Sequence, residues 1–134
     1  MTLLDARSPK PRSLFRRFLP LIIFIGGTLG ILVAYRFRDY PEERAVSRFL
    51  RTLEEGNYQR GYQLWQPVKS YSFESFMHDW GPQGDYGKIR SFEVVGTRSK
   101  GSNNVIVSVR INNQDPPLDI LVDRKTKGLA YSPF

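Results

Sequence analysis

FLPLIIFIGGTLGILVAY, residues 18–35, decides the architecture because this run contains no charged side chain. A helix that crosses the hydrocarbon of a bilayer needs about 20 apolar residues, within a range of about 17–25. Arginines flank the run on both sides, and long arginines snorkel to the interface, so a slightly short span is tolerated. No face of the run is polar, which argues against a buried helix of a soluble domain. We therefore predict a transmembrane helix over residues 18–35.

A cleaved signal peptide is the competing interpretation of the same run. Cleavage after Ala34 would place Leu32 at the third position before the cut, where signal peptides carry a small residue. The poor cut site favours a permanent anchor. In a helix that begins at Phe18, Pro20 falls in the first turn, where its missing N–H does little harm.

Small residues recur every fourth position along the predicted helix, at Gly26, Gly30 and Ala34. This spacing places them on one face and lets two helix backbones approach closely in lipid. Glycine is also simply common in membrane helices. The spacing therefore does not decide whether this face packs against another helix. A partner helix could belong to a second copy or to another membrane protein.

The formal net charge of +7 is concentrated in the short segment before the apolar run. Residues 1–17 contribute +4 and residues 36–134 contribute +3. This pattern is typical of a tail that meets anionic headgroups, and it does not indicate a nucleic-acid partner. The side chains that we expect to contact lipid headgroups flank the apolar run: Arg12, Arg16, Arg17, Arg36 and Arg38.

Charge counting alone leaves the orientation open, because five basic residues precede the run and five follow at a comparable distance. A short N-terminal tail is easily retained, and long C-terminal domains translocate largely regardless of charge. We expect residues 1–17 to form a cytoplasmic tail and the C-terminal domain to be extracytoplasmic, at a bacterial inner membrane.

Residues 36–40 are the predicted connector, and residues 41–134 are the predicted domain. Three helix signals follow one another. Pro41 suits a first helical position and Gly56 an end, Asn57 can cap a second helix that closes before Pro67, and Ser72 can cap a third. The apolar stripes of these helices are formed by Val46, Phe49, Leu50 and Leu53, by Tyr58, Gly61, Tyr62 and Trp65, and by Phe73, Phe76, Met77 and Trp80.

Beyond residue 87 the apolar period changes to two. Residues 88–97 fit a strand imperfectly, residues 104–111 fit one clearly, and residues 118–122 and 128–132 follow. The short turn-rich linkers between them predict antiparallel pairing. The expected fold class is α+β, with three short helices covering one face of a sheet of three to four strands.

The stretch AVSRFLRTLEEGNYQRGYQLWQP, residues 45–67, resembles the opening of small nuclear-transport-factor-2-like (cystatin-like) domains, including membrane-anchored bacterial ones. The matching positions are Phe49, Leu50, Leu53, Gly56, Asn57, Tyr58, Tyr62 and Pro67. The resemblance covers roughly residues 41–132. It implies a curved sheet wrapped around a helix in the shape of a cone, which holds a ligand in some relatives and binds partners in others.

Two departures from that pattern bear on any pocket. The last strand of such domains often carries a glycine followed by a tryptophan, whereas Gly128 is here followed by Leu129. The domain is also short.

Residues that could support catalysis are few. His78 is the single histidine and falls on the solvated side of its helix, near Glu74. Asp119 and Asp123 lie opposite an apolar strand face, where a solvated face is a better interpretation than an acid pair inside a cone. One histidine and no cysteine argue against a transition-metal site. We predict no catalytic residues, no cofactor and no metal.

Two basic clusters remain: Arg44, Arg48 and Arg51 on the first domain helix, and Arg124, Lys125 and Lys127 on a turn. The aromatic residues fall on core stripes, so stacking of bases beside these clusters is not indicated. A solvated face or contact with lipid headgroups is the expected role of both.

These patterns favour a non-catalytic, membrane-anchored interaction domain that serves as an accessory, assembly or scaffold component of a membrane complex. Its partners would be the bilayer and another membrane protein or a second copy, with no nucleic acid. One alternative is a tethered cone that binds or transforms a small apolar ligand, and another is a module that binds the lipid surface, which salt-sensitive binding to anionic vesicles would support. A pocket of several hundred Å³ would favour the ligand-binding cone, whereas a cone filled by side chains would favour the scaffold.

Overall fold

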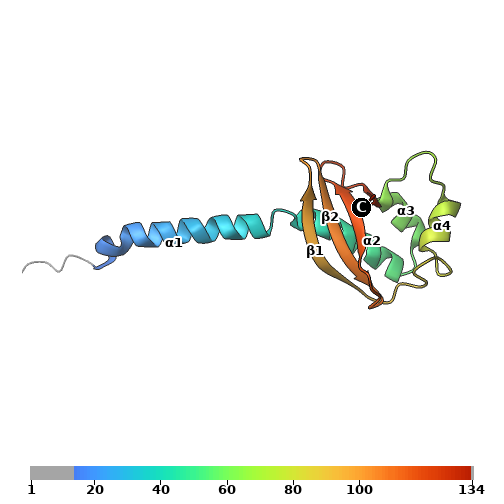
Figure 1. Cartoon of the computed structure of the whole chain (residues 1–134), viewed down its shortest axis with the longest axis horizontal. Helices are drawn as coiled ribbons and strands as arrows, with labels where there is room; N and C mark the ends of the chain where they lie inside the picture. The colour runs from blue at the N-terminus through green and yellow to red at the C-terminus, as the bar shows by residue number, and fades with distance from the viewer. Residues whose placement is uncertain (1–13, 134) are drawn as a thin grey trace, which may run out of the picture. The chain divides into compact units, whose positions relative to one another are not determined.

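The computed structural model describes residues 14–133. The chain divides into two compact units, of which the first ends at Arg38 and the second begins at Asp39. The first unit contains α1 (Leu14–Arg36), a helix of 23 residues without a buried side chain. At 1.5 Å per residue this helix is about 34 Å long, enough to cross the hydrocarbon of a bilayer. Within the described residues, α1 contains the one helical stretch that is long and apolar enough to do so (Figure 1).

The predicted span of residues 18–35 lies inside α1, but the helix already includes Leu14. The placement of Pro20 in a first turn is therefore wrong, because Pro20 is the seventh described residue of the helix. Its missing N–H removes a hydrogen bond from the helix interior. Farther along, the Thr28 hydroxyl donates to the Phe24 carbonyl at 2.8 Å, so this polar side chain is satisfied within the helix.

The second unit begins with three helices: α2 (Tyr40–Glu54), α3 (Tyr58–Trp65) and α4 (Phe73–Trp80). The predicted caps are confirmed, since the Asn57 side chain accepts from the Arg60 N–H at 3.2 Å and the Ser72 hydroxyl accepts from the Ser75 N–H at 3.1 Å. Gly56 follows α2 with a φ of 80°, a left-handed conformation that glycine adopts without strain. Only residues 37–39 separate α1 from α2.

Four strands follow in chain order: β1 (Phe92–Lys100), β2 (Asn104–Ile111), β3 (Leu118–Asp123) and β4 (Leu129–Tyr131). They form one sheet of order β1-β2-β3-β4 in which every neighbouring pair is antiparallel. The prediction of an α+β domain with an antiparallel sheet is confirmed.

The first strand differs from the prediction of residues 88–97, because it starts at Phe92 and continues to Lys100. The register shifts between Val94 and Gly96, so Val95 is an extra residue in the strand. A bulge of this kind reverses the alternation of side chains beyond it. Val94 pairs with Val109, and Thr97 pairs with Val107. Both partners are buried on the same face, so Val94 and Thr97, three residues apart, also lie on one face.

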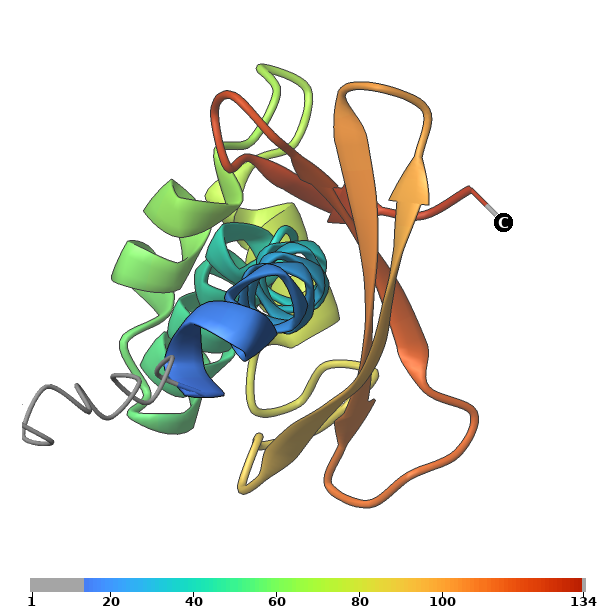
Figure 2. The same cartoon turned by 90° about the vertical axis from the view of Figure 1, so that its left-hand side faces the viewer.

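The three domain helices lie on one side of the sheet (Figure 2). Val46, Phe49, Leu50 and Leu53 of α2 are completely buried, and so are Val105, Val107, Val109, Ile120 and Val122 on the facing side of the sheet. The predicted stripes therefore meet in one core. Gly61 permits the close approach of α3 to α2, because a Cβ at that position would lie 2.6 Å from Leu53 Cδ2.

Candidate functional site

The space between the helices and the sheet is filled by aromatic side chains. Phe49 lies at the centre, with ring centroids 5.2 Å from Trp65, 6.1 Å from Phe76 and 5.0 Å from Trp80. All four side chains are at most 5% exposed. Edge-to-face and tilted contacts at such distances are those of a packed core. The region between the helices and the sheet is therefore occupied by packed rings.

A tyrosine pair borders this core and could supply proton-transfer groups. The Tyr71 hydroxyl donates to Asp79 at 2.6 Å, and the Tyr131 ring stacks on Trp80 with centroids 6.0 Å apart. Burial raises the pKa of Tyr71, and its hydrogen bond to the Asp79 carboxylate raises that pKa further. Burial among the same rings also raises the pKa of Tyr131. Both phenols therefore stay protonated at neutral pH, which suits hydrogen bonding and not the role of a base.

The residues singled out for possible acid–base chemistry lie outside the core. The His78 side chain is 83% exposed, and its nearest acid is Asp79, at 3.5 Å, in place of the expected Glu74. Asp119 lies on the sheet face away from the helices, where it accepts a hydrogen bond from Ser108 and pairs with Arg98 at 2.7 Å. These contacts, above all the one with Ser108, lower the pKa of Asp119.

Asp123 has a structural role at the turn between β3 and β4. Its carboxylate accepts from the backbone N–H groups of Lys125 and Thr126, both at 2.8 Å. These two hydrogen bonds, that of Thr126 first, lower the pKa of Asp123. The solvated-face interpretation of the two aspartates thus agrees with their surroundings.

A cluster of ion pairs ties the start of α2 to the β3–β4 turn. Lys127 Nζ lies 3.0 Å from Glu42 Oε1, and Arg124 lies 2.9 Å from Asp39 and 3.6 Å from Glu42. The Glu42 side chain is only 4% exposed, and its Oε2 atom finds no hydrogen-bond partner among residues 14–133. The expectation that Arg124 and Lys127 belong to a solvated or lipid-facing cluster is therefore wrong. The acids that hold them lie 85 residues away in the sequence.

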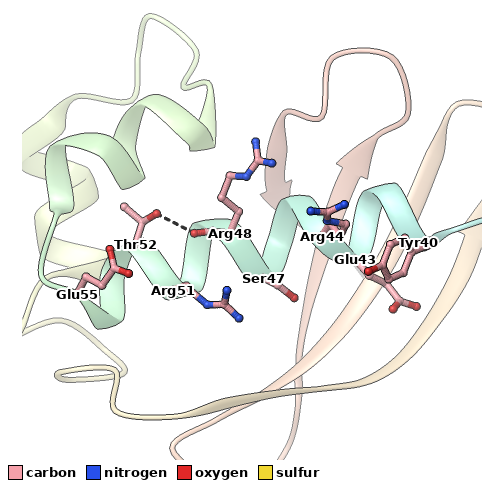
Figure 3. Close-up of a pocket in the computed structure, with 8 residues that line it drawn as sticks. All are labelled: Tyr40, Glu43, Arg44, Ser47, Arg48, Arg51, Thr52 and Glu55. Atoms are coloured by element: carbon pink, nitrogen blue, oxygen red, sulfur yellow. Dashed lines mark hydrogen bonds between the residues drawn. The ribbon is translucent and has the colours of Figure 1, made fainter.

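Arg44, Arg48 and Arg51 behave differently from Arg124 and Lys127. At 100° per residue they fall within an arc of about 60° on the outer side of α2. All three are exposed, and within the described part of the chain none forms an ion pair with an acid. Figure 3 shows their guanidinium groups along α2, with Glu43 and Glu55 towards its two ends.

A hollow of about 470 Å³ flanks these arginines, and we call it the arginine groove. It lies between α2, the end of α3 and the β3–β4 turn. The residues that line it are Tyr40, Pro41, Arg44, Ala45, Arg48, Leu64, Gln66, Thr126 and Lys127. The Gln66 side chain donates to the Thr126 carbonyl at 2.7 Å, which joins α3 to the turn. A second hollow, of about 540 Å³, lies along the outer side of α2 and is lined by Glu43 and Glu55 as well as the three arginines.

The residues predicted to pack or to touch lipid lie along α1. An added Cβ at Gly26 or Gly30 would meet nothing within 4 Å, so this face is open in the single chain. Ala34 follows on the same helix, near its C-terminal end. Arg16 and Arg17 lie in the first described turn, Arg36 ends the helix, and Arg38 lies over the ring of Tyr35 at 5.7 Å. Arg12 lies outside the described residues.

Sequence reasoning found the exposed arginines but missed the groove beside them. Gln66 and Thr126 come from segments that look like an ordinary helix end and an ordinary turn, and nothing in their spacing links them to α2.

No three acidic, histidine or cysteine side chains gather to hold a metal ion in residues 14–133. No family model, curated protein or solved structure matches the chain.

Proposed function

We propose that the protein is a non-catalytic, membrane-anchored interaction domain that serves as an accessory, assembly or scaffold component of a membrane complex in a bacterium. The observation that carries this proposal is the aromatic packing of Phe49, Trp65, Phe76 and Trp80 between the helices and the sheet. This packing occupies the place where a ligand-binding cone keeps its cavity. What the domain offers to a partner is therefore its outer surface.

The anchor is supported by the composition of α1. Its apolar side chains are exposed along the whole helix, and the least exposed large one, Leu19, is still 40% exposed. Apolar surface on this scale is stable in lipid or against another helix, and unfavourable in water. The open face at Gly26, Gly30 and Ala34 would let a second helix approach closely.

The basic N-terminal tail supports an orientation in the membrane, and the element order of the domain supports a relationship in fold. A short basic N-terminal tail in the cytoplasm leaves the domain, residues 39–134, on the extracytoplasmic side of the inner membrane. Three helices followed by an antiparallel sheet are also the element order of nuclear-transport-factor-2-like domains, which would make this domain a small, side-chain-filled cone. That relationship concerns fold alone.

Crosslinking of the full chain in native membranes, followed by mass spectrometry of the purified adducts, tests this function. We expect one defined complex that contains the chain and a second membrane protein or a second copy. Recovery of monomer alone would contradict the proposal. A matched chain whose α1 is replaced by an unrelated membrane helix separates partners held by α1 from partners held by the domain.

Turnover or tight binding of a small apolar ligand would instead favour the alternative of a tethered enzymatic or ligand-binding cone. Binding should then depend on the ring cluster, so Trp65→Phe would weaken it. Under the interaction-domain proposal this variant affects stability and leaves complex formation intact.

A further inference from the structure

The arginines of α2 carry charge that the fold does not use. Two acids at the start of α2 are already paired with the β3–β4 turn: Asp39, just before the helix, with Arg124, and Glu42 with Arg124 and Lys127. Glu43 and Glu55, which lie beside the arginines, form no ion pair with them within residues 14–133. Arg44 and Arg48 point away from the core, and Arg44 lies over the Tyr40 ring at 5.8 Å. The first turns of α2 therefore expose positive charge that no ion pair within residues 14–133 offsets.

The arginine groove has the chemistry of a phosphate site with an apolar floor. Its free cationic side chains are Arg44 and Arg48, because the third cation that lines it, Lys127, is already paired with Glu42; no acidic residue lines the groove. Pro41, Ala45 and Leu64 supply apolar contact. Guanidinium groups bind phosphate oxygens in a bidentate manner, and apolar surface beside them suits the glycerol and first methylene groups of a lipid. The neighbouring hollow contains Glu43 and Glu55 and is less suited to an anion.

The residues of the groove follow α1 closely in the sequence, which favours a lipid of the bilayer as the source of the phosphate. Only four residue steps separate Arg36, the end of α1, from Tyr40, the start of α2, and a chain spans at most about 3.5 Å per step. Arg44 follows one helical turn later. Tyr35, Phe37 and Tyr40 are exposed on both sides of this connector, and aromatic residues of this kind settle at the headgroup level of a bilayer.

We propose that the arginine groove binds the phosphate headgroup of an anionic phospholipid in the bilayer that α1 spans. Arg44 and Arg48 hold the phosphate, the apolar floor contacts the lipid backbone, and Arg51 adds to the attraction of the surface. This contact fixes the domain against the membrane on a second point besides α1. The proposal rests on the membrane anchor proposed above.

The test uses the full chain in nanodiscs of phosphatidylcholine alone or of phosphatidylcholine with phosphatidylglycerol. The chain has no cysteine, so Ser47→Cys introduces a single site for a nitroxide label beside the arginines. Contact with the surface immobilises the label and exposes it to a relaxation agent confined to lipid headgroups. We compare the chain with R44Q/R48Q and with R60Q/R90Q, which removes two exposed arginines elsewhere and changes the net charge equally.

We expect surface contact in the anionic nanodiscs only, and its loss in R44Q/R48Q but not in R60Q/R90Q. At about 1 kcal/mol per arginine, the ratio of bound to free label should fall roughly 30-fold in R44Q/R48Q. High salt should weaken the contact in the unsubstituted chain.

Equal contact in neutral and anionic nanodiscs, or equal loss in both variants, overturns the lipid site. A label that stays free in anionic nanodiscs but crosslinks to an acidic protein segment in native membranes also overturns it, in favour of a protein partner. A chain that inserts into nanodiscs without surface contact loses this inference alone. A chain that does not insert loses the anchor as well.

Discussion

α1 and α2 are both regular helices, but they treat their apolar side chains in opposite ways. Apart from Tyr40 in its first turn, α2 confines its large aliphatic and aromatic residues to one face, and it buries Val46, Phe49, Leu50 and Leu53 completely. α1 carries apolar residues all round and buries none. The second unit thus has a core of its own, whereas α1 buries no side chain within residues 14–133.

The difference separates two properties that can be broken independently. Folding of residues 39–134 should depend on the ring cluster and the ion pairs around α2. Attachment to the membrane should depend on the apolar surface of α1. The four substitutions and conditions below act on one property and leave the other unchanged.

Phe49→Ala should have the largest effect, a loss of about 3–5 kcal/mol of unfolding free energy, because it removes the ring at the centre of the core. Denaturant titration followed by tryptophan fluorescence measures it, and the protein should still sediment with membranes. Phe73→Ala is the control, because Phe73 is 37% exposed and should cost much less. Equal effects of the two substitutions would contradict the described core.

Ile25→Arg should weaken membrane insertion by about 2.5–3.5 kcal/mol, because it places a charge near the middle of α1. The fraction of protein in the carbonate-resistant membrane pellet measures this loss. Ile25→Leu controls for the substitution itself and should leave the pellet fraction unchanged. A carbonate-resistant fraction equal to that of Ile25→Leu would contradict the expected cost of a charge at this depth.

Glu42→Ala should cost about 2 kcal/mol, because it leaves Lys127 without its buried partner, whereas Arg124 keeps Asp39. The neighbouring Glu43→Ala is the matched control, since no ion pair of Glu43 is found within residues 14–133. Thermal unfolding of both variants is compared with that of the unsubstituted chain. A lower unfolding temperature in Glu42→Ala alone shows that the ion pairs stabilise the start of α2, and equal temperatures in both variants would contradict this.

Local chemistry accounts for what the sequence predicted well. The caps Asn57 and Ser72 and the helix end at Gly56 depend on contacts within a few residues, and the strand over residues 104–111 shows in the sequence as alternating apolar side chains. The predicted end of β1, at residue 97, came before Lys100 because the bulge at Val95 breaks the period that identifies a strand. No short sequence pattern predicts where such an extra residue enters a strand.

The ion-pair cluster and the arginine groove could not be predicted, because each joins segments far apart in the sequence. Glu42 looks like an ordinary acid in a first helical turn, and Lys127 like an ordinary turn lysine, yet they meet across 85 residues. Asn112 is a second example. Its side chain accepts from the Arg90 N–H at 2.7 Å and donates to the Lys88 carbonyl at 3.0 Å.

Alkaline pH should produce a smaller, graded loss of stability. Burial raises the pKa of Tyr71 and Tyr131 in the folded chain, so the unfolded chain releases these protons first. The stability that these groups contribute is therefore complete below about pH 10, the pKa of an unfolded tyrosine, and declines above it. Denaturation midpoints between pH 8 and pH 11 should fall less steeply in Tyr71→Phe. Identical slopes would contradict the buried position of the hydroxyl.

Carbonate extraction of membranes that contain the full chain, with the mature N-terminus determined on the same sample, tests the anchor most directly. We predict that the protein stays in the pellet and keeps residues 18–35. Release into the supernatant, or a mature chain that starts beyond Tyr35, would contradict the permanent membrane helix and the account of placement built on it.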